Sequence, residues 1–222
     1  MDIIESGYGD DALRVFELFI APYDQDTSWN SNGVPGTYRF LNRLWTLVQE
    51  FLEAKAGTQD ESEAIYKATH ACIKKVTQDL EGLSFNTAVA SMMGAVNDLC
   101  LIKAKDGYAS RDAWQFALES LVQLIGPFAP HIAEELWHDL GHKDSVHIGH
   151  WPEWDEKYLV NDTVTYAVQV NGKVRGEVEV PADADQSTVE KVARANEKVA
   201  GYITGDPKKV IFVQGKLISF VV

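Results

Sequence analysis

The feature that most constrains the fold is the pair Asn171-Gly172, which joins two runs of alternating apolar and polar residues, 164–170 and 173–181. Such alternation is typical of half-buried β-strands. A type I′ turn needs positive φ at both central residues, which Asn and Gly tolerate best. The segment therefore predicts a β-hairpin. Lys173 and Arg175 follow the turn two residues apart, so we expect both side chains on one face of the second strand.

The residues after the hairpin predict one helix and two more strands. A helical pattern begins at Gln186 or Ser187 and continues to about Ile203. Two apolar runs follow, 210–213 and 217–222, on either side of a tight turn at 214–216. The order ββαββ predicts a small sheet with one covering helix for residues 163–222.

Residues 38–141 carry apolar side chains at helical spacing, in five stretches separated by Gly, Ser and Pro. We interpret the apolar stripes as the core of an antiparallel helical bundle. Residues 142–162 are expected to be a linker that crosses the surface. The fold class predicted is thus α+β, an antiparallel helical bundle followed by a small ββαββ domain.

Residues 1–37 are expected to be a lead-in to the bundle. Residues 10–19 predict a short helix that Asp10 or Asp11 could cap, and Pro22 ends it. Residues 24–36 are rich in Asp, Asn, Ser, Gly and Pro, as loops are. Because so short a segment cannot bury a core of its own, we interpret it as a remnant that links to a domain further upstream.

Charge is distributed unevenly along the chain. The net charge is −13 over 222 residues, but residues 1–162 carry −14 and residues 163–222 carry +1. A long-range field of negative sign would not steer RNA to the protein, although local Lys and Arg clusters can still bind phosphates. No unbroken apolar run reaches the ~18–20 residues of a membrane span, and no basic signal region follows Met1. We expect a cytoplasmic protein with reduced thiols at Cys72 and Cys100.

Two histidine patterns invite a catalytic or metal-binding interpretation. Residues 147–150 read H-I-G-H, the signature of class I aminoacyl-tRNA synthetases, but a strand should precede it and a helix should follow it. Here Gly141 ends a helix before it and Trp151-Pro152 follow, and the partner motif K-M-S-K-S is absent. His138 and His142 stand four apart, but Gly141 interrupts their helix. We therefore expect no catalytic residues and no metal site.

Several segments resemble one enzyme family. Residues 127–137 are similar to the P-x-x-P-H-x-x-E-E-L-W segment of the leucyl, isoleucyl and valyl synthetases. Residues 8–14 resemble the Y-G-A-D-x-L-R segment of class I synthetases, with Asp10 in place of Ala. Residues 25–30 and 36–45 resemble the approach to the anticodon-binding bundle in the leucyl branch. The run Q-V-N-G-K-V-R at 169–175 resembles the C-terminal domain of bacterial-type leucyl-tRNA synthetase.

The resemblance implies a C-terminal, tRNA-binding part of such a synthetase, inactive alone and without a cofactor of its own. The parent enzyme uses ATP with Mg to attach leucine to its tRNA. The implied partners are leucine tRNA and the parent's own catalytic domain, with neither membrane nor DNA. The bundle would lie along the anticodon stem, and the tail domain would reach the outer corner of the tRNA.

The resemblance also implies which residues contact tRNA. The cations of the tail are expected to contact backbone phosphates: Lys173, Arg175, Lys208, Lys209 and Lys216. Asn171 and Gly172 are expected to shape the turn. Arg39 and Arg43, on the first bundle helix, are further candidates for tRNA contact. The alternative is ordinary surface charge, or ion pairs with acids for the two arginines. Two other functions stay open, namely the corresponding region of a valyl or isoleucyl synthetase and an acidic helical module that binds proteins.

Overall fold

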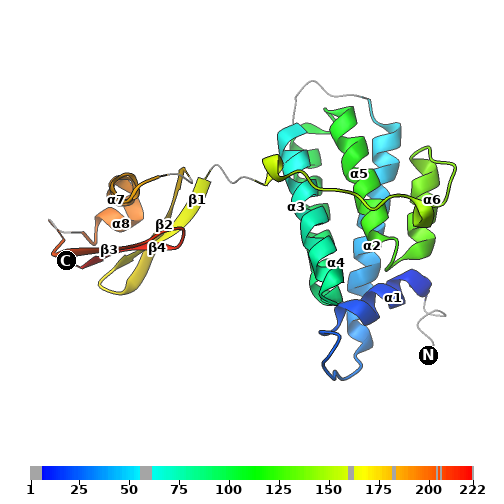
Figure 1. The fold of residues 1–222 in the computed structure, drawn as a ribbon, viewed down its shortest axis with the longest axis horizontal. Helices are drawn as coiled ribbons and strands as arrows, with labels where there is room; N and C mark the ends of the chain where they lie inside the picture. The colour runs from blue at the N-terminus through cyan, green and yellow to red at the C-terminus, as the bar shows by residue number, and fades with distance from the viewer. Residues whose placement is uncertain are drawn as a thin grey trace. The chain divides into compact units, whose positions relative to one another are not determined.

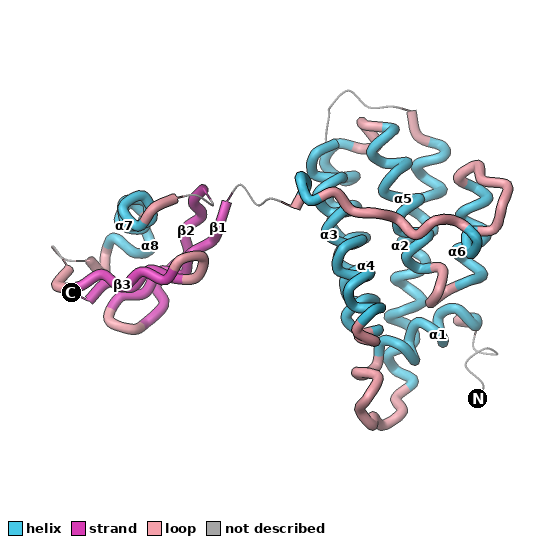
Figure 2. The backbone as a smooth tube through the Cα atoms, viewed as in Figure 1, coloured by secondary structure: helices cyan, strands magenta, loops and turns pink. Residues whose placement is uncertain are grey.

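The structure, a computed structural model, describes residues 7–55, 62–159, 163–181, 184–203, 205 and 207–221. The chain divides into two compact units, Met1–Leu159 and Val160–Val222 (Figure 1). The first unit is helical and the second is built on a sheet (Figure 2). The α+β class, with a helical bundle followed by a small strand domain, is therefore confirmed.

The first unit holds six α-helices within its described residues, together with short 3-10 turns at Ser31–Gly33, Val146–Ile148 and Glu156–Tyr158. The α-helices are α1 (Gly9–Phe19), α2 (Val34–Glu53), α3 (Ser62–Glu81), α4 (Phe85–Asp106), α5 (Arg111–Ile125) and α6 (Pro130–Asp139). Helix α3 packs against both α4 and α5. The connections from α3 to α4, from α4 to α5 and from α5 to α6 are short, which favours the antiparallel arrangement of a bundle.

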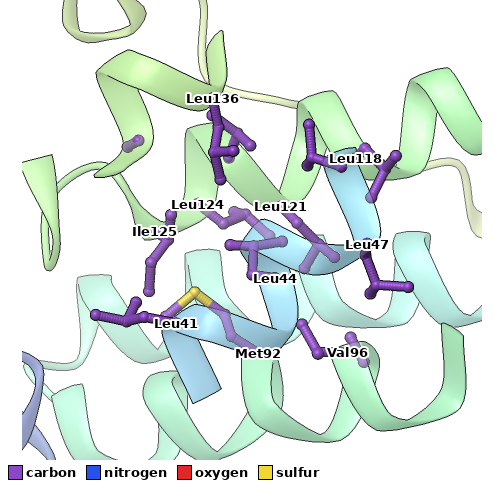
Figure 3. Close-up of a cluster of buried hydrophobic side chains, with 14 of the residues drawn as sticks. Leu41, Leu44, Leu47, Met92, Val96, Leu118, Leu121, Leu124, Ile125 and Leu136 are labelled. Atoms are coloured by element: carbon purple, nitrogen blue, oxygen red, sulfur yellow. The ribbon is translucent and has the colours of Figure 1, made fainter. Parts of the chain in front are cut away.

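The core of the bundle lies where α2, α4, α5 and α6 face one another (Figure 3). Its side chains recur at helical spacing, and burying each one fully contributes about 1.5–3 kcal/mol. The buried residues labelled in Figure 3 are Leu41, Leu44, Leu47, Met92, Val96, Leu118, Leu121, Leu124, Ile125 and Leu136.

Helix α1 belongs to this core. Ala12, Val15 and Phe16 are buried in the same cluster as the bundle residues, and α1 packs on α2 and α4. Helix α2 begins at Val34, inside the segment that was expected to lead into the bundle. The apolar face of α1 thus packs within this chain, whatever else precedes it.

Helix α4 combines length with high hydropathy. Within the described residues it is the one helix that is long and apolar enough to cross a membrane, with a mean hydropathy of 1.3, by length and composition only. The sequence was expected to lack such a span because only unbroken apolar runs were considered, whereas α4 intersperses polar residues. Its apolar side chains supply the bundle core, through Ala88, Val89, Met92, Ala95, Val96 and Leu99.

The segment expected to be a linker crosses the surface of the bundle, and its residues 142–159 belong to the first unit. Val146 is buried with the bundle core. Further along, the segment docks on α3: the indole N–H of Trp151 donates to Thr77 Oγ1 at 2.8 Å, and Lys74 Nζ pairs with Glu156 at 2.7 Å. Residues 151–158 are therefore held along one helix. The end of the expected linker, 160–162, lies outside the described residues.

The second unit is a four-stranded sheet, β1 (Thr163–Val170), β2 (Lys173–Pro181), β3 (Lys209–Val213) and β4 (Leu217–Val221). The strand order is β2-β1-β4-β3. The central pair β1 and β4 is parallel, and the two outer pairs are antiparallel hairpins. Helices α7 (Gln186–Ala195) and α8 (Glu197–Ala200) lie on one side of the sheet (Figure 1).

The predicted Asn-Gly hairpin is confirmed. Asn171 and Gly172 have φ values of +50° and +78°, both positive as a type I′ turn requires. The prediction of one continuous helix to about Ile203 is wrong, because Asn196 is extended and separates α7 from α8. Its side chain accepts a hydrogen bond from the backbone N–H of Lys198 at 3.0 Å. Asn favours this capping role over a helix interior.

Candidate nucleic-acid interface

Three of the candidate lysines gather at one end of the sheet. Lys173 pairs with Val170 of β1, directly after the Asn171-Gly172 turn. The backbone N–H of Lys208 donates to Val221 O at 2.7 Å, at the same end of the neighbouring strands. Lys209 pairs with Val221. All three side chains are exposed, but Lys173 lies on β2 at one edge of the sheet and Lys209 on β3 at the other, so the positive charges are spread across the width of this turn end.

Lys216 lies at the opposite end of the sheet. It precedes Leu217, which pairs with Ala167 in the middle of β1. The turn there is fixed by the backbone N–H of Gly215, which donates to the hydroxyl of Tyr166 at 2.9 Å. The sequence grouped Lys216 with the other tail cations because all lie near turns. The parallel pairing of β1 with β4, which sequence spacing does not reveal, separates it from them.

Arg175 sits in a β-bulge. Gln169 pairs with Val174 and Val168 pairs with Gly176, so Arg175 is the extra residue of the hairpin. Simple alternation would place Arg175 on the side away from buried Val178 and Val180. Its guanidinium instead lies 4.1 Å from the ring centroid of Tyr202, next to α8. The bulge therefore turns Arg175 to the helix-covered side, the side that Lys173 shares through its partner Val170.

The structure adds a cation that the sequence did not indicate. Lys198 is exposed on α8 and lines the same surface as Arg175. Its place depends on Gly176, where a Cβ would come within 3.0 Å of Val199 Cγ2. A larger residue at this position would have to displace Val199 by a few tenths of an ångström, so glycine favours the close approach of α8 to β2. No short-range sequence pattern indicates that Lys198 belongs to this surface, because in the sequence it is an ordinary surface lysine of a helix.

The two bundle arginines are both exposed on α2. Arg43 donates a hydrogen bond from Nη1 to Asn97 Oδ1 of α4. The hydrogen-bond partner of Arg43 is therefore a neutral amide and not an acid, in contrast to the ion pair that was the alternative for this residue. Arg39 and Arg43 lie four residues apart on one helix of the first unit, whereas the tail cations belong to the second unit.

The histidine patterns have structural roles in the described residues. His147–His150 lie in the segment that crosses the bundle, where residues 146–148 form a 3-10 turn rather than a strand and helix. His138 Nδ1 lies 2.9 Å from the carbonyl of His142, and His142 Nε2 lies 2.8 Å from Glu119 Oε1. Among the residues that the structure describes, no three His, Cys, Asp or Glu side chains gather as metal ligands would.

Sequence comparison identifies the class of domain. Residues 62–192 match the family described as the anticodon-binding domain of tRNA ligases. The match covers α3 to α6, the crossing segment, the β1–β2 hairpin and part of α7. The chain belongs to this family.

The relatives narrow the class to one ligase. The chain is 46% identical over 224 residues to the leucine–tRNA ligase of Chlorobaculum tepidum and 40% identical over 222 residues to that of Herpetosiphon aurantiacus, in both cases over 100% of its own length. It spans 27% of the length of each of these curated relatives. The similarity places it with the leucyl branch, as the Q-V-N-G-K-V-R segment predicted.

A solved structure has the same fold. The LeuRS of Agrobacterium radiobacter K84 (AgnB2), crystallised as a ternary complex with tRNA and LeuAMS, matches with a TM-score of 0.77 and 27% identity. The match covers 100% of this chain and 30% of that one.

Proposed function

We propose that this chain binds leucine tRNA and positions it for ATP-dependent leucylation by a leucine–tRNA ligase. The observation that carries the proposal is similarity to leucine–tRNA ligases along the whole chain, 46% identity in the Chlorobaculum tepidum enzyme. The relative crystallised with tRNA supports it. Because these relatives are leucine enzymes, the leucyl branch is favoured over the valyl or isoleucyl alternative.

The chemistry of leucylation lies elsewhere in this proposal. The leucine, the ATP and its Mg ion would be bound by the catalytic domain of the ligase, and this chain would contribute no cofactor site. The chain's partners would be leucine tRNA and that catalytic domain, in the cytoplasm, with neither a membrane nor DNA involved. Its own role would be to orient the tRNA.

The cations of the second unit fit this role better than the acidic first unit does. Lys173, Lys208 and Lys209 lie at one end of the sheet, in the part of the chain whose net charge is +1. Phosphate contacts fix the register and orientation of a nucleic acid without reading its sequence. Asn171 and Gly172 would contribute by setting the turn that precedes Lys173. Lys216, at the other end, and Arg39 and Arg43, on α2, would be secondary contacts.

The experiment is fluorescence anisotropy of labelled leucine tRNA with the 222-residue chain at several salt concentrations. The test variant is Lys173→Glu combined with Lys208→Glu and Lys209→Glu. Each lost phosphate contact should flatten the slope of log K against log salt by about 0.9. Lys191→Glu, on the exposed side of α7, is the matched control of equal charge type. Lys216→Glu measures how far along the sheet the RNA extends.

A tRNA with a short variable arm distinguishes leucine specificity from general RNA affinity. The proposal predicts tighter binding to leucine tRNA and a loss in the triple variant that Lys191→Glu does not reproduce. If the wild-type chain binds neither tRNA, or if the triple variant binds leucine tRNA as the wild type does, the proposed role of the turn-end cations is wrong. Specific capture of a protein partner by the acidic helical part of this chain would then favour the scaffold alternative.

A further inference from the structure

A groove with a volume of about 640 Å³ lies between β2 and α8. It is lined by Val174, Arg175, Gly176, Glu177, Asn196 and Lys198. Two of these six residues are cations, contributed by elements far apart in the sequence. The groove lies entirely within the second unit, so its shape does not depend on how the two units are arranged.

Arg175 is held in place but keeps its hydrogen-bonding capacity. Its guanidinium stacks over the ring of Tyr202, 4.1 Å from the centroid. The Nε atom is buried, and within the described part of the chain it has no hydrogen-bond partner. Because Nε is buried, a ligand in the groove would be bound by the terminal Nη groups of the guanidinium. Cation–π contact orients the guanidinium without using any of its five N–H donors.

Lys198 supplies the second charge from the other wall. Asn196 anchors this wall twice: its Nδ2 donates to the backbone carbonyl of Glu177 at 3.2 Å, and its Oδ1 accepts from Lys198 N at 3.0 Å. Gly176 allows the close approach of α8 to β2. The N-terminus of α8 is therefore bonded to β2, the strand that contains the bulge. This contact fixes the backbone of Lys198 relative to Arg175.

The one acid in the lining does not neutralise the groove. Glu177 pairs with Ala167 across the hairpin, and it alternates with Gly176 and Val178, which face the helices. Its side chain therefore leaves on the open face of the sheet, and its backbone is what lines the groove. Among the lining residues of the groove, no carboxylate side chain therefore lies between the two cations.

We propose that this groove is a phosphate-binding subsite for RNA, in which Arg175 and Lys198 hold one phosphodiester group and Tyr202 positions Arg175. This inference rests on the proposed function and assigns Lys198 and Tyr202 to it. A guanidinium presents N–H donors in a planar fork that suits phosphate oxygens, and a lysine adds a point charge. Lys173, which lies on the same strand and the same side of the sheet as Arg175, would contact a neighbouring phosphate of the same backbone.

The test compares variants in anisotropy titrations of labelled leucine tRNA against salt. Lys198→Gln is the central variant, because Lys198 is exposed and its substitution leaves the fold intact. We expect about three- to tenfold weaker binding and a salt slope reduced by about 1. Lys191→Gln removes the same charge from the exposed side of α7 and should leave both values unchanged.

Tyr202 is a positioning residue, so its test needs a conservative rescue. Tyr202→Phe keeps the ring under Arg175 and should bind as the wild type does, whereas Tyr202→Leu should bind more weakly. Arg175→Lys keeps the charge but loses the planar fork, so affinity should fall while the salt slope is retained. Circular dichroism and thermal unfolding of each variant confirm that the sheet is intact.

The outcomes separate this inference from the proposed function. If Lys198→Gln and Tyr202→Leu bind like the wild type while the turn-end triple variant loses binding, the second unit binds tRNA but the groove does not, and the inference is overturned. Equal losses in Lys198→Gln and Lys191→Gln would also overturn it, because the effect would be one of general charge. If the wild-type chain does not bind leucine tRNA, the proposed function and the inference both fall.

Discussion

Asp11 caps a helix to which it does not belong: its Oδ2 accepts the backbone N–H of Ile132, in the first turn of α6, at 2.7 Å. The other carboxylate oxygen lies 2.9 Å from Nδ1 of His131. The N-cap residue of α6 is Ala129, which has no side-chain acceptor. The carboxylate of Asp11 therefore satisfies the helix end from 121 residues away in the sequence.

The first prediction concerns Asp11→Ala, which should lower the free energy of unfolding by about 1–2 kcal/mol, as loss of a helix cap does. The negative charge near the N-terminus of α6 also favours the helix dipole. Equilibrium urea unfolding, followed by tryptophan fluorescence, measures the change. Asp10→Ala is the matched control, one position away in the same helix. Equal losses in the two variants would show that the capping contact contributes nothing.

The sequence predicted the first helix but not the role of Asp11 in the fold. The sequence predicted a short helix at residues 10–19 with Asp10 or Asp11 as its cap, and the helix is present as α1, Gly9–Phe19. However, the N-cap position of α1 is Tyr8, which forms no side-chain cap, and Asp11 serves α6 instead. Local pattern identifies a residue type suited to capping. Only the packing of α1 against α6 decides which helix receives it.

The same distinction applies to the candidate site. The hairpin, the bundle and the two final strands follow from spacing that acts over a few residues, so the sequence predicted them. The parallel β1–β4 pairing places Lys173, Lys208 and Lys209 at one end of the sheet and Lys216 at the other. Lys198 lines the same groove as Arg175 because Gly176, which has no side chain, allows α8 to pack closely on β2. These are contacts between distant segments, which no local pattern contains.

The second prediction concerns Gly176→Ala, which should destabilise the second unit by about 1–3 kcal/mol through overpacking. An added Cβ would meet Val199 Cγ2 at 3.0 Å. The cost should be smaller in a Val199→Ala background, where that methyl group is absent. A double-mutant cycle, with amide hydrogen exchange of residues 163–181 as the readout, measures the coupling. Additive effects of the two substitutions would contradict the close approach.

The third prediction concerns the two thiols. Burial raises the pKa of Cys72 to about 12, against a smaller lowering effect of the Ser91 hydroxyl bonded to its sulfur. Because the thiolate is the reactive form, Cys72 should not react with a thiol reagent in the native protein. Cys100 is only partly buried and should react first. A Cys100→Ser variant that still titrates one fast thiol would contradict this assignment.

The fourth prediction concerns His70, against which the crossing segment docks. Its ring is stacked on Tyr158, with centroids 4.6 Å apart, and Nδ1 accepts the backbone N–H of Asp155 at 3.2 Å. A protonated Nδ1 could not accept this bond. Burial lowers the pKa of His70 from its usual value of 6.5, opposed by the charge of Asp155 and assisted by that of Lys157.

The pKa of His70 is lower in the folded state than in the unfolded state, so the unfolded chain binds the proton first as pH falls. The free energy of unfolding should therefore decrease as pH falls below about 6.5. His70→Phe retains a ring for Tyr158 but cannot titrate, so its stability should change less between pH 7.5 and 5.5. Urea midpoints at the two pH values measure the difference.

Asp155 and Glu156, whose pKa values are lowered by hydrogen bonds from Lys157 and Lys74, titrate below this window. Parallel pH profiles for wild type and His70→Phe would show that His70 is not the group responsible for the loss of stability in acid.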